Sequence, residues 1–166
     1  MKVAIIANGT IRNYEKIKRI IKDYEYIICV DGGVEHALKM DVIPDLIVGD
    51  LDSAAKKTIQ YYEDLGVNVE TFPAEKDFTD THLAMNIAVN KRADEIGMFG
   101  VTGNRIDHCL ANMMLFWYVD NSGIKCKIID DHNELFLAGD VTILKKREGE
   151  LVSLISLSQR TKIKKL

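Results

Sequence analysis

The sequence predicts an α/β fold with a doubly wound, mostly parallel sheet that carries helices on both faces. Two observations predict it. Short apolar, β-branched runs recur along the chain, and longer segments with helical spacing of apolar residues lie between them. Strands that alternate with helices pair in parallel and are joined by right-handed crossovers, which place helices on both faces of the sheet.

Five apolar runs are expected to form the strands of the parallel sheet. They are Val3 to Ala7, Tyr26 to Val30, Leu46 to Val48, Val67 to Phe72 and Glu95 to Phe99. Three other segments repeat apolar residues every three to four positions, which is typical of helices that pack by one face. These segments are Asn13 to Tyr24, Thr79 to Ala93 and Arg105 to Val119.

The pattern changes after about Ser122, where short strand-like runs are joined by polar turns. The runs are Lys125 to Ile129, Glu134 to Ala138, Val141 to Lys145 and Leu151 to Leu157. This pattern predicts the start of an antiparallel β-layer. We therefore expect an α/β domain over residues 1–122 and a partial, incomplete C-terminal β-region over residues 123–166.

The composition is that of a globular protein and excludes several functional classes. Of 166 residues, 47% are hydrophobic and 28% are charged, and the net charge of −3 gives no basic surface for nucleic acid. No segment has the length of a membrane span, and the N-terminal apolar run is too short for a signal peptide. The scattered cysteines Cys29, Cys109 and Cys126 predict free thiols in a reducing compartment. We expect a cytoplasmic protein that binds neither nucleic acid nor membranes.

Aspartates follow several of the predicted strands. Asp31 comes after the second strand, Asp50 and Asp52 after the third, and Asp80 at the start of the helix after the fourth. Ligands of open α/β sheets bind beyond the carboxyl ends of the strands. Carboxylates that converge there repel one another unless a cation lies between them. The pattern therefore predicts a Mg²⁺ site at this edge, with coordination positions left for phosphate oxygens.

Each aspartate, taken alone, has a simpler interpretation. Asp50 or Asp52 would cap a helix beginning near Ser53, and Asp80 would lie at the positive end of a helix dipole. Their occurrence together with Asp31 favours the metal site.

A second group of candidates is polar and contains glycine. Asn8 follows the first strand at the same expected edge, where a tight turn is the alternative. The segment Gly100 to Arg105 joins a strand to a helix, so its backbone N–H groups and the arginine guanidinium could face a phosphate. The first turns of the following helix carry Asp107, His108 and Asn112. For Asp107 and His108, a capping carboxylate beside a surface histidine is an equally good explanation.

Four ordered segments of the chain resemble the thiamine pyrophosphokinase family. They are Asp31-Gly32-Gly33, Pro44 to Ser53, Lys76 to Asp80, and Gly103 to His108 followed by Asn112. The second segment, P-D-L-I-V-G-D-L-D-S, is the most specific, and the likeness covers nearly the whole chain. The resemblance implies that residues 1–122 form a nucleotide-binding catalytic domain. It also implies transfer of pyrophosphate from Mg-ATP to the hydroxyl of thiamine, which gives thiamine diphosphate and AMP.

The resemblance also implies roles for single residues. Asp31, Asp50, Asp52 and Asp80 would surround Mg²⁺ and the triphosphate of ATP. Asp50, Asp52, Asp80 and Lys76 would be catalytic, with Asp52 or Asp80 as the general base. The residues implied around the nucleotide are Asn8, Gly32, Gly33, Ser53, Thr79, Arg105, Asp107, His108 and Asn112. Members of the family hold thiamine between the subunits of a homodimer, so a homodimer is expected.

The chain departs from the family pattern at two places. Asn104 stands where a second glycine is usual, and asparagine tolerates left-handed backbone angles. The family continues through further strands with a late Ser-Asn segment and an aromatic residue, whereas this chain ends at Leu166. The alternatives are a truncated nucleotide-binding domain with weak or no turnover, or a pyrophosphokinase with another heterocyclic alcohol, such as a pterin, as acceptor. A nucleotide-sugar transferase would explain Asp50-Leu51-Asp52 but not the other segments.

Overall fold

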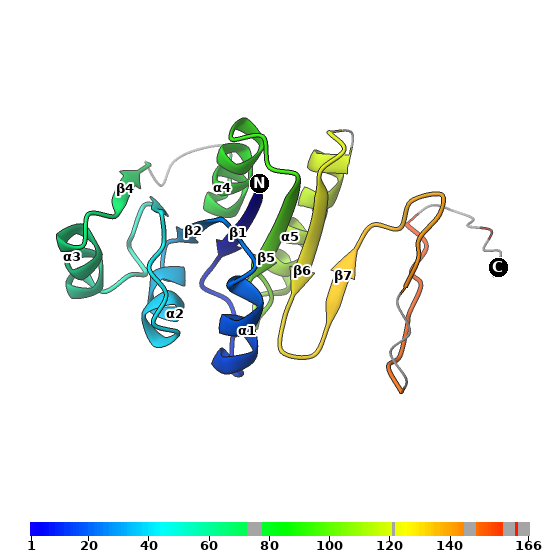
Figure 1. Cartoon of the computed structure of the whole chain (residues 1–166), viewed down its shortest axis with the longest axis horizontal. Helices are drawn as coiled ribbons and strands as arrows, with labels where there is room; N and C mark the ends of the chain where they lie inside the picture. The colour runs from blue at the N-terminus through cyan, green and yellow to red at the C-terminus, as the bar shows by residue number, and fades with distance from the viewer. Residues whose placement is uncertain (73–77, 121, 145–148, 158–161, 163–166) are drawn as a thin grey trace.

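The structure, a computed structural model, describes residues 1–72, 78–120, 122–144, 149–157 and 162 (Figure 1). Its strands are β1 (Lys2–Ile6), β2 (Tyr26–Val30), β3 (Leu46–Gly49), β4 (Asn68–Thr71), β5 (Glu95–Phe99), β6 (Lys125–Ile129) and β7 (Glu134–Phe136). Its helices are α1 (Tyr14–Ile21), α2 (Gly33–Lys39), α3 (Lys56–Asp64), α4 (Asp80–Asn90) and α5 (Ile106–Asp120).

The described strands form one sheet in the order β4-β3-β2-β1-β5-β6-β7. Neighbouring strands are parallel except β6 and β7, which are antiparallel. The first strand lies inside the sheet, where Val3 pairs with Tyr26 of β2 and Lys2 pairs with Glu95 of β5. From β1 the chain first adds strands β2 to β4 on one side of the sheet and then strands β5 to β7 on the other side. The position between β1 and β5 is therefore the topological switch point of the sheet.

Helices cover both faces of the sheet, as the sequence predicts. On one face, β1 side chains such as Val3 and Ile5 pack against Met85 of α4 and Phe116 of α5. On the other face, alternate β1 residues belong to a second core cluster that also includes buried residues of α1, α2 and α3. Alternate side chains of a buried parallel strand point to opposite faces, so nearly every residue of β1 is apolar. None of the helices in the described ranges combines the length and apolarity that crossing a bilayer requires.

Three sequence predictions differ from the structure. The first is α2, a seven-residue helix for which no helical segment was expected. The second is the run Lys125 to Ile129, which was expected to begin the antiparallel layer. It forms β6 and pairs in parallel with β5, because α5 provides the crossover between these strands. The antiparallel arrangement begins only with β7, through the turn at 131–133.

The third difference concerns the last two predicted strands, Val141 to Lys145 and Leu151 to Leu157. Their described residues, 141–144 and 151–157, contain no strand and run away from the sheet (Figure 1). Their apolar side chains are exposed, for example Ile143 at 86% and Leu151 at 98%. A β-branched apolar run becomes a strand only where a neighbouring strand supplies hydrogen bonds and burial. Among the described residues, no strand pairs with these two runs, although both have the sequence pattern of strands.

Candidate active site at the carboxyl edge of the sheet

The loops after β1 and β5 meet at the switch point and are joined through their backbones. The N–H of Ala7 donates to the carbonyl of Phe99 over 2.9 Å, and the N–H of Thr10 donates to the carbonyl of Thr102 over 2.7 Å. A Cβ on Gly9 would lie 2.3 Å from the Gly100 carbonyl oxygen, so only glycine permits this approach. The exposed residue Asn8 lies on this joined pair of loops, at the edge where the sequence predicts it.

The four aspartates predicted to bind metal lie together beside these loops. Asp31 is half-buried at the end of β2, and burial together with the charges of Asp80, Asp50 and Asp52 raises its pKa from 3.8 to about 6. Charges that raise the pKa of Asp31 must lie near it, in a medium of lower dielectric than water. We refer to Asp31, Asp50, Asp52 and Asp80 as the acidic corner.

The backbone of the acidic corner adopts unusual angles. Asp31 has φ of +46° and Leu51 has φ of +61°, both in the left-handed region, and Gly49 has φ of +138°. The carboxylate of Asp31 accepts a hydrogen bond from the N–H of Leu51 over 3.3 Å. The carboxylate of Asp50 accepts one from the N–H of Asp52 over 3.1 Å. Positive φ at residues other than glycine is strained and is concentrated at functional sites.

The simpler interpretation of Asp50 and Asp52 as helix caps does not apply. Helix α3 begins at Lys56, and its N-cap is Ala55, which has no capping side chain. At α4 the helix-dipole interpretation is correct, since Asp80 is its first residue. The predicted nucleotide residue Thr79 is the N-cap of α4, and its hydroxyl accepts a hydrogen bond from the N–H of His82 over 3.2 Å.

The chemistry of the acidic corner fits a magnesium ion that arrives with a triphosphate. Within the described ranges, no group of three or more His, Cys, Asp or Glu side chains is arranged to hold a metal by itself. Mg²⁺ bound with a nucleotide takes one or two carboxylates and completes its octahedron with phosphate oxygens and water. Asp31 and Asp50, both half-buried, offer such donors, and a cation would relieve the repulsion that raises the pKa of Asp31.

The predicted glycine pair, Gly32 and Gly33, packs helix α2 against β1. A Cβ on Gly33 would lie 2.1 Å from the Ile6 carbonyl oxygen, and one on Gly32 would lie 2.5 Å from the side chain of Asn8. The N–H of Gly32 donates to the hydroxyl of Ser53 over 3.1 Å, which ties α2 to the acidic loop. Gly33 is therefore required for the close approach of α2 to the β1 backbone, whereas Gly32 lies against the exposed side chain of Asn8.

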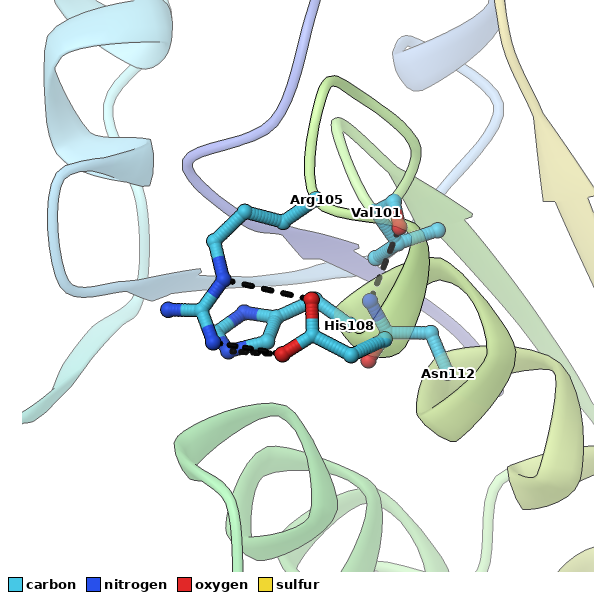
Figure 2. Close-up of polar contacts among 5 residues, drawn as sticks. Val101, Arg105, His108 and Asn112 are labelled. Carbon is cyan, nitrogen blue, oxygen red and sulfur yellow. Dashed lines mark hydrogen bonds and ion pairs between the residues drawn. The ribbon is translucent and has the colours of Figure 1, made fainter.

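The basic side of the candidate site lies on the loop after β5 and the first turns of α5 (Figure 2). Arg105 and Asp107 form an ion pair with Nη2 to Oδ2 of 2.5 Å, and both side chains are exposed. The hydrogen bond from Arg105 lowers the pKa of Asp107 to about 2. His108 is also exposed, with its Nε2 4.0 Å from the Asp107 carboxylate. The predicted phosphate ligand Arg105 is thus accessible but paired within the protein.

Asn112, which the resemblance places near the nucleotide, forms a hydrogen bond within the protein. Its side chain is 8% exposed, and its amide donates to the carbonyl of Val101 over 2.8 Å (Figure 2). It therefore holds the loop after β5 against α5. The predicted catalytic residue Lys76 lies outside the described residues.

A shallow cavity of about 480 Å³ lies where the loop after β6 meets the start of α1, lined by residues that include Arg12, Tyr14 and His132. The carboxylate of Asp131 accepts the N–H groups of Arg12 and Asn13 there, each over 2.9 Å. The first N–H groups of this helix region are therefore satisfied by the protein itself. This cavity does not include the acidic corner.

Comparison with known proteins identifies the chain's relatives. The family model described as "Thiamin pyrophosphokinase, catalytic domain" matches residues 17–128, which include the acidic corner and Arg105 to His108. A "Thiamine pyrophosphokinase" of Bacillus subtilis is 31% identical over 159 residues, 95% of this chain and 74% of that protein. "Thiamine pyrophosphokinase 1" of Oryza sativa subsp. japonica is 27% identical over 131 residues, 66% of this chain and 49% of that protein.

Solved structures show the same fold. The crystal structure of thiamine pyrophosphokinase from Bacillus subtilis matches with a TM-score of 0.68 at 30% identity, covering 81% of this chain and 62% of that one. A thiamin pyrophosphokinase family protein from Enterococcus faecalis matches with a TM-score of 0.64 at 30% identity, covering 81% and 63%. The matched region thus spans less than two thirds of each solved chain.

Proposed function

Because the chain belongs to the thiamin pyrophosphokinase family, we propose that it transfers the terminal pyrophosphoryl group of ATP to the hydroxyl of thiamine. The products are thiamine diphosphate and AMP. The observation that carries the proposal is the convergence of Asp31, Asp50, Asp52 and Asp80 at the carboxyl edge of the sheet, inside the region that the family model matches. Transfer of this kind depends on alignment and charge neutralisation more than on covalent participation by the protein.

Mg²⁺, when bound with ATP, would neutralise the phosphate oxygens and polarise the reacting phosphorus. The acidic corner would hold that ion, with half-buried Asp31 and Asp50 as the inner donors. Arg105, exposed on the loop after β5, would exchange its contact with Asp107 for a phosphate oxygen. Lys76 would hold a second phosphate oxygen, as its position in the family motif implies.

The proton of the thiamine hydroxyl requires an acceptor, and Asp52 and Asp80 are the candidates. Asp52 is exposed, so it has room to approach an incoming substrate. Asp80 is the first residue of α4 and is half-buried, so it has less room to approach the substrate. This difference favours Asp52 as the general base and Asp80 as a member of the cation site.

We also propose a cytoplasmic homodimer. The cysteines Cys29, Cys109 and Cys126 are free and buried, which suits a reducing compartment. The exposed apolar side chains between 141 and 157, such as Ile143, support association with a second subunit, because surfaces of this kind mark interfaces. Thiamine binding between subunits remains part of the proposal.

The test is product analysis by chromatography after the protein is mixed with ATP, Mg²⁺ and thiamine. The expected products are AMP and thiamine diphosphate in equal amounts, absent when EDTA replaces Mg²⁺. A parallel reaction with a hydroxymethyl pterin tests the acceptor. Magnesium-dependent ATP binding without either product would overturn the proposed turnover and favour the truncated nucleotide-binding domain.

A further inference from the structure

His36 is a buried polar residue with no part in the proposed chemistry. It lies on α2, is 9% exposed, and joins two elements that flank the site. Its Nε2 lies 2.8 Å from the carbonyl oxygen of Gly9, in the loop after β1. Its Nδ1 lies 3.0 Å from the hydroxyl of Tyr14, the first residue of α1. The spacing of His36 along the sequence resembles no ligand set.

The two partners determine the tautomer of His36. A carbonyl oxygen only accepts hydrogen bonds, so Nε2 carries the hydrogen and donates to Gly9. Burial, the main cause, lowers the pKa of His36, which keeps the ring neutral at neutral pH. The unprotonated Nδ1 then accepts from the Tyr14 hydroxyl. The imidazole therefore has a fixed orientation, with its donor directed at the loop after β1.

Gly9 is the residue at which the two switch-point loops approach most closely. Its N–H donates to the Gly100 carbonyl, and the next N–H, of Thr10, donates to Thr102. The loop that begins at Gly100 leads to Arg105, the proposed phosphate ligand. The two polar backbone groups of Gly9 have different partners. Its N–H donates to the Gly100 carbonyl in the loop after β5, and its carbonyl lies near His36 of α2.

We propose that His36 is a positioning residue, which fixes the Asn8–Gly9 turn against the loop after β5 and so aligns the nucleotide-binding edge. This inference rests on the proposed function for its ligand, Mg·ATP. Loss of the Nε2 hydrogen bond leaves a half-buried carbonyl at Gly9 without this donor, which favours displacement of the loop.

Two substitutions at position 36 separate the two hydrogen bonds. Glutamine in His36→Gln places an amide N–H near the position of Nε2, so it retains a donor for Gly9. Asparagine in His36→Asn reaches only as far as Nδ1, so it keeps a partner for Tyr14 and loses the bond to Gly9. Both variants replace a ring with an amide and carry a similar packing loss. Tyr14→Phe is a milder third variant that removes only the hydroxyl.

Amide hydrogen exchange measures the position of the loops without any ligand. In His36→Asn, exchange at the N–H groups of Gly9 and Thr10 is expected to rise about tenfold, the equivalent of one hydrogen bond. The N–H of Lys125, bonded to the Asp94 carbonyl over 3.0 Å and remote from His36, is the internal control and should not change. His36→Gln and Tyr14→Phe both keep a donor for the Gly9 carbonyl, so in these two variants the same amides should stay close to wild type.

Calorimetry with Mg·ATP measures the consequence for binding. The Kd of His36→Asn should increase about tenfold, while that of His36→Gln changes about threefold or less. Equal exchange and equal Kd in the two variants would overturn the inference, since the effect would then come from lost packing alone. If the wild-type protein forms no thiamine diphosphate but the two variants still differ in Kd, the proposed function fails and the positioning role stands.

Discussion

The carboxylate of Asp31 lies against the backbone of Gly49, so closely that a Cβ at position 49 would be 1.7 Å from Oδ1 of Asp31. Gly49, the last residue of β3, thus packs directly against the side chain of Asp31, which follows β2. The φ of +138° at Gly49 is a second requirement for glycine at the same position. The acidic corner therefore depends on a residue that carries no functional group.

Gly49→Ala is expected to lower the free energy of unfolding by about 2–4 kcal/mol, because it combines backbone strain with a clash against Asp31. Chemical denaturation measures this loss. Gly66→Ala is the matched control: Gly66 has φ of +83° with no atom within 4 Å of the added Cβ, so it reports strain alone. The loss should be about 1 kcal/mol there. An equal decrease in the free energy of unfolding of Gly49→Ala and Gly66→Ala would contradict the close contact between Gly49 and Asp31.

The stability of the magnesium-free protein should fall as pH rises from about 4 to about 6. The pKa of Asp31 is raised from 3.8 to about 6, so the folded state holds a proton that the unfolded state has released in this range. The contribution of Asp31 to the free energy of unfolding is fully present below about pH 4 and is lost as the pH rises through about 6. After allowance for partial solvent screening, it amounts to about 1–2 kcal/mol.

Thermal unfolding in EDTA across this pH range measures that loss. Asp31→Asn should remove this part of the pH dependence, while Asp140→Asn, an exposed residue of the C-terminal region, should keep it. An unchanged slope in Asp31→Asn would show that other groups cause the dependence.

Asp50→Asn and Asp52→Asn should each reduce turnover by at least about a hundredfold, since each removes a charge from the proposed cation site or the proposed base. Both side chains would keep their size, so far-ultraviolet circular dichroism should match the wild type. Steady-state rates across a Mg²⁺ titration separate the roles. A higher Mg²⁺ requirement is expected for Asp50→Asn, and a lower kcat with unchanged Mg²⁺ requirement for Asp52→Asn. Unchanged rates in both would remove the acidic corner from the mechanism.

Arg105→Ala should increase the Kd of Mg·ATP about ten- to a hundredfold, the range of a hydrogen bond to a charged group. The thermal midpoint should not change measurably, because the ion pair with Asp107 is exposed. Lys18→Ala is the control for the loss of an exposed ion pair, since Lys18 contacts Asp41 over 3.4 Å on the far end of α1. Wild-type affinity in Arg105→Ala would exclude the phosphate contact.

The sequence was sufficient to predict the doubly wound sheet and the gathering of the aspartates. Strands β2 and β5 begin and end where their apolar runs do, because polar residues or glycine bound both runs. The aspartates meet because carboxyl ends of parallel strands share one edge, which follows from topology alone. The family to which the chain belongs was also identified correctly from its motifs.

What the sequence could not predict depends on contacts between distant elements. Helix α2 is short and begins at Gly33, a weak helix former, so its spacing alone did not indicate a helix. The bond between His36 and Gly9 joins residues 27 positions apart, with no local signal. The run Leu151 to Leu157 has strand composition but lies without a described neighbour, and composition does not reveal that.

The internal position of β1 has a consequence for how the chain acquires its structure. Strand β1 pairs with both β2 and β5, yet Glu95 of β5, which pairs with Lys2, is synthesised much later than β1. Until then, one edge of a mostly apolar strand lacks its hydrogen bonds. Pairings between residues so distant in sequence make folding slow and leave the nascent chain prone to aggregation.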